Sequence, residues 1–242
     1  MTAATKLSAL ALVPDEAAWP EIQALRSLHD SRQFPVWPPH VNILYPFVQE
    51  ADFSDAARRL AEATAAIGPM KLRFSRLGRF GRVAFLAPEC DDDPGLAKLY
   101  EACASAFPEL PLERHAFCPH LTVGQFRSAA ECRSFFDSAV PIVVDVEIAC
   151  LSMLARDTMK DPFRTPLQVR LGDGVCAGDV RPYAPDPEMA AAAERGRCAA
   201  LAASPCIEEK SPVVEISAVA LSGTRQLRRE RRRKSVSSKS LA

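Results

Sequence analysis

The sequence predicts an α+β fold, and three observations lead to this expectation. Strand-like and helix-like segments alternate between residues 6 and 171. The turn at 78–81 (GRFG) joins two of the strands as a hairpin, so the sheet is mixed or antiparallel rather than parallel. A short motif built around histidine occurs twice, 80 residues apart, each time after a proline-bearing loop. This repeat predicts two similar lobes related by a pseudo-twofold axis.

The expected strands are rich in β-branched and aromatic residues, and the expected helices carry apolar residues at helical spacing. We expect strands at 6–13, 40–47, 70–77, 82–87, 120–126, 142–155 and 167–171. We expect helices at 15–30, 53–67, 93–107 and 128–139. Asp15 and Ser54 are typical N-caps of the first two helices. The proline-rich segment 31–39 is expected to be a loop.

Residues 1–172 are expected to form one bilobal domain, and residues 173–242 a mostly disordered extension in which 190–203 is typical of an isolated helix. Residues 225–242 hold eight Lys or Arg and one Glu. The whole chain has 30 basic and 30 acidic residues, so the rest of it, the body at residues 1–224, has 22 basic and 29 acidic residues. Such a body lacks the broad basic face of a duplex-binding protein. The run from Arg228 to Lys234 is typical of a nuclear localisation signal or an RNA-contacting arm, and equally of a solvated tail.

Composition indicates no metal site, no cofactor and no membrane span. The eight cysteines form no CxxC pair and no zinc-like spacing. Scattered thiols of this kind are typical of a cytoplasmic protein. No stretch approaches the roughly 20 apolar residues that cross a bilayer. We expect a cytoplasmic monomer, with the nucleus as the alternative if the basic run is a localisation signal.

The two motifs are the strongest functional signal, and they read Pro39-His40-Val41-Asn42-Ile43 and Pro119-His120-Leu121-Thr122-Val123. Side chains alternate between the two faces of a strand, so His40 and Asn42 are expected to share one face. His120 and Thr122 are expected to share a face for the same reason. Two such strands lying side by side would surround one cavity with two imidazoles and two hydrogen-bonding groups.

That cavity suits a phosphodiester. One histidine can accept a proton from the attacking oxygen while the other protonates the leaving oxygen, because the pKa of imidazole lies near neutrality. The Thr122 hydroxyl and the Asn42 amide can donate hydrogen bonds to the non-bridging oxygens. This chemistry needs no metal.

PPHVNILYPF and CPHLTVGQF resemble the paired H-x-[ST]-hydrophobic motifs of the two-histidine phosphoesterase superfamily, which includes the RNA 2′,3′-cyclic phosphodiesterases, or 2′-5′ RNA ligases. The resemblance covers about residues 6–171. It implies a bilobal α+β fold with antiparallel sheets around a central cleft, and helices outside. It also implies opening of a 2′,3′-cyclic phosphate of an RNA end or nucleotide, with a ligase-like reverse reaction. By position, His40 and His120 match the catalytic histidines, and Thr122 matches the second phosphate-binding hydroxyl.

Two positions depart from the family pattern. Asn42 stands where the family usually has Thr or Ser, and Gln125 where RNA-processing members often carry a basic residue. Arg79, Arg82 and Arg127 are candidates to replace that charge. The departures motivate a second reading, a nucleotide- or RNA-end-binding module with little or no turnover. In a third reading the basic tail alone mediates interaction, which leaves the paired motifs unexplained.

Three aromatic residues are candidates to line the cleft or stack on a base, namely Trp37, Tyr45 and Phe126. Tyr45 and Phe126 follow the two motifs, and Trp37 lies in the loop before His40. For each of them packing in the core or anchoring of a loop is the competing interpretation.

Overall fold

The computed structural model of the chain describes residues 3–89, 94–111, 117–138, 142–178 and 181–202. The strands are β1 (Ala4–Thr5), β2 (Ser8–Leu12), β3 (Val41–Leu44), β4 (Phe47–Val48), β5 (Met70–Phe80), β6 (Val83–Pro88), β7 (Leu121–Gln125), β8 (Val144–Ile148), β9 (Cys150–Ala155), β10 (Arg164–Arg170) and β11 (Gly174–Ala177). The α-helices are α1 (Trp19–His29), α2 (Phe53–Thr64), α3 (Pro94–Ala106), α4 (Ala129–Ser138) and α5 (Pro187–Ala202). Short 3-10 turns at Glu16–Ala18 and Glu50–Asp52 precede α1 and α2.

Within the described residues, nine strands form one antiparallel sheet in the order β11-β10-β9-β2-β3-β7-β6-β5-β8, and β1 pairs with β4 beside it. Strand β8 illustrates the pattern that builds this sheet. Its sequence VDVEI buries Val144, Val146 and Ile148 and exposes the two acids between them. Such alternation is typical of an antiparallel strand with one solvated face. The expected α+β class with antiparallel strands is confirmed.

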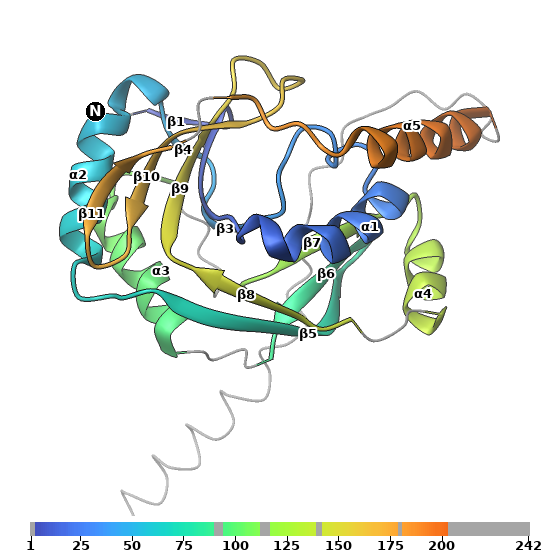
Figure 1. Ribbon diagram of the computed structural model, residues 1–242, viewed down its shortest axis with the longest axis horizontal. Helices are drawn as coiled ribbons and strands as arrows, with labels where there is room; N and C mark the ends of the chain where they lie inside the picture. Colours follow the sequence, from blue (N-terminus) through green and yellow to red (C-terminus); the bar gives the residue numbers. More distant parts are fainter. Residues whose placement is uncertain (1–2, 90–93, 112–116, 139–141, 179–180, 203–242) are drawn as a thin grey trace, which may run out of the picture. The chain divides into compact units, whose positions relative to one another are not determined.

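The sheet has two halves that meet at the repeated motifs. Strands β11, β10, β9, β2 and β3 form the first half, and β7, β6, β5 and β8 form the second. They join where Val41 of β3 pairs with Leu121 of β7. The chain also links the halves at Ala149, which lies between β8 and β9 (Figure 1). The single strand expected at 142–155 is therefore two strands, because β8 pairs with β5 at one edge whereas β9 is enclosed between β10 and β2.

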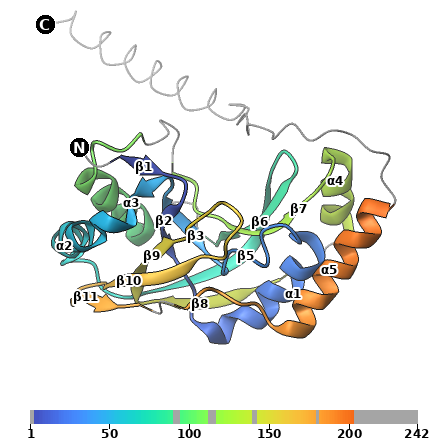
Figure 2. The ribbon, with the colours of Figure 1, turned by 90° about the horizontal axis from the view of Figure 1, so that it is seen from above.

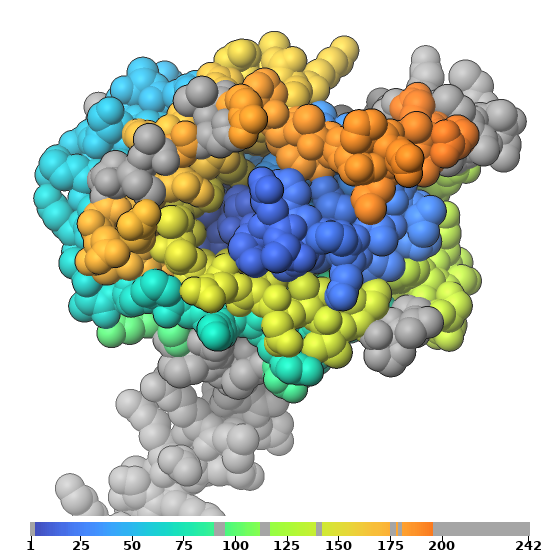
Figure 3. Space-filling view, in the orientation of Figure 1, coloured from blue at the N-terminus to red at the C-terminus, as the bar shows by residue number. Residues whose placement is uncertain are grey.

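Helices cover the sheet in two groups, which Figures 1 and 2 show from perpendicular directions. Helices α2 and α3 lie side by side, α2 against β10 and β11 and α3 against β3. They bury the larger apolar core, which includes Leu60, Leu99 and Phe107. Helix α1 packs on β7, and α5 packs on α1. Figure 3 shows the molecule hollowed beside α1, with the N-terminal strand in dark blue at the bottom of the hollow.

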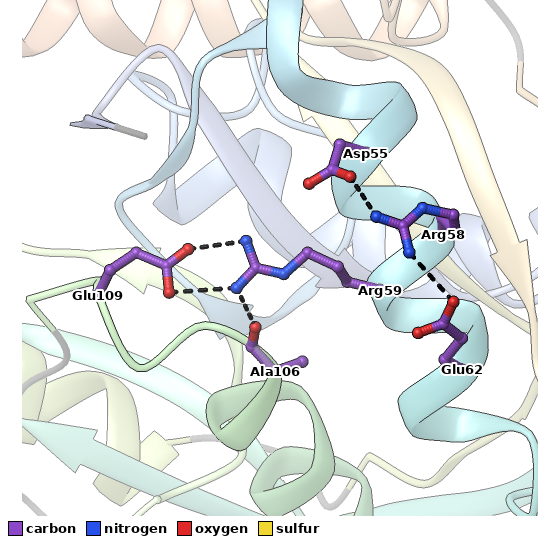
Figure 4. Close-up of polar contacts among 6 residues, drawn as sticks. All are labelled: Asp55, Arg58, Arg59, Glu62, Ala106 and Glu109. Carbon is purple, nitrogen blue, oxygen red and sulfur yellow. Dashed lines mark hydrogen bonds and ion pairs between the residues drawn. The ribbon is translucent and has the colours of Figure 1, made fainter. Parts of the chain in front are cut away.

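Arginines on α2 fix that helix to its surroundings (Figure 4). Arg58 forms ion pairs along the exposed side of the helix with Asp55, at 2.5 Å, and with Glu62, at 3.2 Å. Arg59 reaches the segment that follows α3, where its two terminal nitrogens donate to the Glu109 carboxylate and to the carbonyl of Ala106. The guanidinium also lies over the Phe107 ring, 4.2 Å from its centroid. Exposed pairs such as those of Arg58 contribute little, whereas the half-buried Arg59 bridge adds a polar contact to the apolar packing of α2 on α3.

The ordered fold continues past the boundary expected at residue 172. Strand β11 pairs with β10 across a turn in which Gly172 and Gly174 have positive φ. The helix expected to be isolated is α5, which packs on α1 and buries Ala193. The break in hydrophobic period at 172 is thus a hairpin turn. The chain divides into two units, 1–205 and 206–242. The basic run from Arg228 to Lys234 lies outside the described residues.

The described residues contain no helix of the length and apolar character that a membrane span requires.

Candidate active site

The two histidines lie at the seam between the half-sheets. Val41 pairs with Leu121 in antiparallel register. Continued by one residue in each direction, this register sets His40 opposite Thr122 and Asn42 opposite His120. Val41 and Leu121 are buried on the core face, so the four motif side chains lie on the opposite face. All four are half-buried. A pseudo-twofold axis through the Val41–Leu121 pair relates one motif to the other.

Each histidine is oriented by the same backbone contact. The Nδ1 of His40 lies 2.8 Å from the carbonyl oxygen of Pro38, and the Nδ1 of His120 lies 2.8 Å from that of Cys118. A carbonyl oxygen only accepts hydrogen bonds, so both Nδ1 atoms carry a hydrogen and donate it. In the neutral ring the proton-accepting atom is therefore Nε2. The two imidazoles thus present the same atom to a reactant.

Aromatic rings hold both imidazoles in place. Trp37 stacks on His40 with the ring centroids 4.4 Å apart and the planes inclined by 20°. Phe80 and Phe85 flank His120, with centroids 5.2 Å and 5.3 Å from its ring. These aromatic neighbours restrict rotation of the rings, as precise acid–base catalysis requires.

Burial keeps both histidines neutral in the free protein. It lowers the pKa of His40 to about 3, against the opposing effect of the hydrogen bond to Pro38 and with further lowering by the positive charges of Arg26 and His120. Burial also lowers the pKa of His120, and the bond to Cys118 opposes that shift. An anionic phosphate between the rings would raise both pKa values again.

Stability should depend on pH through His40. The folded state holds the ring neutral, whereas the unfolded chain protonates it below its ordinary pKa of 6.5, so stability is lost as pH falls from 6.5 towards 3. At about pH 5 this loss is at most about 2 kcal/mol. Urea unfolding of the wild type and of His40→Asn at about pH 7.5 and about pH 5 measures it.

The buried Asp30 works in the opposite sense in that experiment, because burial raises its pKa to about 7 even though Arg26 opposes the shift. Both proteins carry Asp30, so the difference between their two pH responses isolates His40. The wild type should lose more stability on acidification than His40→Asn. Equal losses would contradict a His40 whose pKa is lowered by desolvation.

Gly78 makes room for the rings beside His120. It lies opposite Phe85 on the neighbouring strand, and a Cβ at position 78 would overlap the Phe85 ring. We expect Gly78→Ala to displace that ring and, with it, His120. The cost in stability should be about 1–3 kcal/mol, the usual scale of overpacking. The loss of activity should be larger than the loss of folded protein explains, because His120 itself is displaced. Gly68→Ala is the matched control, since a Cβ there meets nothing within 4 Å. Equal activity of the two variants would refute this role of Gly78.

The two hydrogen-bonding residues differ in their surroundings. Asn42 has a buried side-chain oxygen with no hydrogen-bond partner in the described part of the chain. A buried unpaired polar atom is costly, and a bound molecule can remove that cost. An amide also offers two N–H donors, and a half-turn about Cβ–Cγ exchanges them with the oxygen. Thr122 lies beside Phe85 of β6, with which it pairs in register.

The aromatic candidates occupy three different places. Trp37 is only 7% exposed and contacts both His40 and Phe163, so little of its ring is open to a base. Tyr45 is half-buried and meets the edge of Trp37 at 5.7 Å. Phe126 contacts His29 and Phe135 beneath α1 and α4 instead of either motif histidine.

Two of the arginines considered as substitutes at Gln125 have contacts of their own. Arg82 donates to the backbone carbonyl of Arg127. The charge of Arg79 acts on Cys132 of α4. The cation that acts on His40 is Arg26, which the motif analysis did not identify. The sequence pattern that could have identified Arg26 is a row of polar residues at helical spacing along α1.

Within the described residues, no three His, Cys, Asp or Glu side chains gather into a group that could hold a metal ion.

Comparison with known proteins identifies a family for this geometry. The family model of the 2′-5′ RNA ligase superfamily matches residues 14–158, more than half of the chain and a range that includes both motifs. A search of curated proteins finds no match. TT0787 of Thermus thermophilus has a similar structure over 68% of this chain and 97% of its own, at 16% identity and a TM-score of 0.52. LigT of E. coli in complex with 3′-AMP is similar over 71% of this chain and 97% of its own, at 17% identity and a TM-score of 0.48.

Proposed function

Because the chain belongs to the 2′-5′ RNA ligase superfamily, we propose that it is a metal-independent phosphodiesterase that opens 2′,3′-cyclic phosphates of RNA ends or nucleotides. His40 and His120 form the general acid–base pair of this proposal. The observation that carries it is the register at Val41 and Leu121, which sets two identically oriented imidazoles on one face of the sheet.

In the proposed reaction one histidine accepts a proton while the other donates one. The Nε2 of one histidine takes a proton from water as the water oxygen bonds to phosphorus. The Nε2 of the other gives a proton to the ribose oxygen as its bond to phosphorus breaks. The product is a ring-opened phosphomonoester, and each histidine ends in the protonation state in which the other began. The Thr122 hydroxyl and the Asn42 amide donate to the non-bridging oxygens, where charge grows in the transition state.

The test is hydrolysis of 2′,3′-cyclic CMP, and of a short RNA with a 2′,3′-cyclic phosphate end, in excess EDTA. We expect turnover of both, with a single phosphomonoester as product. His120→Ala, purified in parallel, measures any contaminating ribonuclease. Activity that EDTA abolishes and a divalent ion restores would refute metal independence. Turnover by the variant equal to the wild type would refute the assignment of the site.

The alternative function is a nucleotide- or RNA-end-binding module with little turnover. One observation favours it. Burial lowers the pKa of both histidines, so the free protein holds no ready acid. The amide of Asn42 and the uncharged Gln125 also supply less stabilisation than a hydroxyl and a cation would. Under this alternative, 2′,3′-cyclic CMP binds and is recovered intact after hours, and binding is lost in His40→Ala.

The remaining expectations belong to the same proposal: a monomer acting in the cytoplasm on RNA ends or nucleotides. Deleting residues 225–242 is expected to leave turnover of 2′,3′-cyclic CMP unchanged, because a mononucleotide is too small to need a basic arm. The same deletion should weaken binding of a longer RNA if the run from Arg228 to Lys234 contacts it. A deletion that abolishes turnover of the mononucleotide would contradict the proposed site.

A further inference from the structure

A row of polar side chains is buried along one side of α1. Gln23, Arg26 and Asp30 are 5%, 2% and 2% exposed. Arg26 donates to the Gln23 side-chain oxygen at 3.0 Å, and its Nε lies 3.5 Å from the Asp30 carboxylate. Charged side chains are rarely buried this deeply without a structural or functional reason. The position of Arg26 is therefore fixed from both sides.

Tyr183 holds the outer end of this row. The Gln23 amide donates to the Tyr183 hydroxyl, and the Tyr183 ring meets the edge of Trp19, 5.8 Å between centroids. Tyr183 lies on the segment between β11 and α5 and beyond residues 14–158, which match the family model. The family resemblance thus assigns no role to this residue.

The backbone of Tyr183 leads to the loop before His40. The Tyr183 N–H donates to the carbonyl of Phe163 at 2.7 Å, and the Phe163 N–H donates to the carbonyl of Val36 at 2.9 Å. The Phe163 ring packs on Trp37 with the centroids 3.9 Å apart. Trp37 in turn stacks on His40. Tyr183 is therefore one hydrogen bond and two ring contacts away from the first histidine.

The side-chain route reaches the same loop from the other side. Asp30, at the end of the polar row, accepts the N–H groups of Gln33 and Phe34 at its backbone carbonyl. The carbonyl of Gln33 then accepts the N–H of Trp37 at 2.8 Å. The row from Tyr183 to Asp30 thus supports the turns that carry Trp37 to its place against His40.

We propose that Tyr183 is a positioning residue for His40. Its hydroxyl orders Arg26 through Gln23, and its backbone N–H ties the same segment to Phe163, whose ring packs on Trp37. This inference rests on the proposed function, since it concerns how the first histidine of that site is held. It extends the working part of the protein beyond the matched family region to the segment that precedes α5.

The charges around His40 determine how the loss of the Tyr183 hydroxyl changes the pKa of His40. Arg26 from α1 and His120 from β7 both disfavour its protonated form, and the Pro38 carbonyl favours it. Asp30 partly neutralises Arg26. Arg156 also lies near the Trp37 ring, with its guanidinium carbon 5.6 Å from the ring centroid, and Tyr45 contacts the same ring. Without the Tyr183 hydroxyl, Gln23 and Arg26 lose their outer support, so the positive charge of Arg26 can move away and protonated His40 becomes easier to form.

The experiment compares full-length wild type with Tyr183→Phe, which removes only the hydroxyl. The imidazole resonances of His40 and His120 are titrated by NMR, and kcat and KM for 2′,3′-cyclic CMP are measured across the same pH range. In Tyr183→Phe the pKa of His40 should rise towards 6.5 while that of His120 stays in place. The value of kcat should fall, by up to ~100-fold, with KM little changed. Tyr100→Phe is the matched control, because its ring stacks on Phe117 of another segment.

Gln23→Met breaks the same hydrogen bond from α1 and should move the pKa of His40 in the same direction. If Tyr183→Phe and Gln23→Met lower the melting temperature but leave the pKa of His40 unchanged, Tyr183 is only structural and the inference is wrong. The titration does not depend on turnover. A wild type that hydrolyses nothing would refute the proposed function, while the response of His40 would still decide the role of Tyr183.

Discussion

Replacing His40 or His120 with alanine is expected to lower kcat for 2′,3′-cyclic CMP by about 10²–10⁴-fold, the usual contribution of a positioned general acid or base. Each ring presents its Nε2 to the reactant, because Nδ1 is committed to a backbone carbonyl two residues earlier. Removing one ring takes away either the base that accepts a proton from water or the acid that gives a proton to the ribose oxygen. The double variant should be little slower than the slower single variant, since the pair acts as a unit.

His29→Ala is the control for these variants. His29 is also half-buried, but it contacts Phe126 and Phe135 rather than the motif residues. It should keep nearly full activity. Circular dichroism should show that all the histidine variants are folded. If one motif variant retained wild-type kcat, the two-histidine mechanism would fail, whatever the other variant did.

Replacing Trp37 with alanine is expected to have the largest effect on stability, a loss of about 3–5 kcal/mol. The ring is 7% exposed and joins Ala9, Ala11, Leu154 and Phe163 in a small apolar cluster on the motif face of the sheet. Its removal leaves a cavity between Phe163 and His40. The imidazole then loses the surface that orients it, so kcat should also fall.

Trp37→Phe separates these two effects. A phenyl ring still packs against Phe163 and retains part of the contact with His40, so it should recover most of the stability and part of kcat. Urea unfolding and steady-state kinetics on both variants measure the outcome. Wild-type stability in Trp37→Ala would mean that the ring is not packed as described and would revive the interpretation that it stacks on a base.

The sequence was sufficient to predict the fold class and the pairing of the motifs. Both follow from period-two and helical patterns and from one repeated motif, which are local properties of the chain. The histidines and the motif residues two positions after them share a face because strands alternate. The boundaries of most helices agree with the expected ones to within a few residues. The glycine-bearing turn between β5 and β6 is predicted as a hairpin, but the fading of the pattern after Gly172 predicts the end of the domain, whereas Gly172 opens the β10–β11 hairpin.

The surroundings of the motifs could not be predicted, because they depend on contacts between segments distant in sequence. Phe80 and Phe85 flank His120 only because β5, β6 and β7 pair in that order. Arg26 acts on His40 because α1 crosses β7, and Tyr183 reaches Gln23 across 160 residues. A polar row at helical spacing, containing Gln23, Arg26 and Asp30, was visible in the sequence. Without the fold it was indistinguishable from the solvated face of a helix.

The central claim is that both histidines face one phosphate, and titration of the two imidazoles with cytidine 2′-monophosphate tests it most directly. In NMR spectra recorded near pH 7, the account predicts that the His40 and His120 resonances shift together, with one dissociation constant. Both pKa values should rise, because the bound anion favours the protonated rings. A shift confined to one histidine, or two shifts with different dissociation constants, would contradict the claim that the two rings share a site.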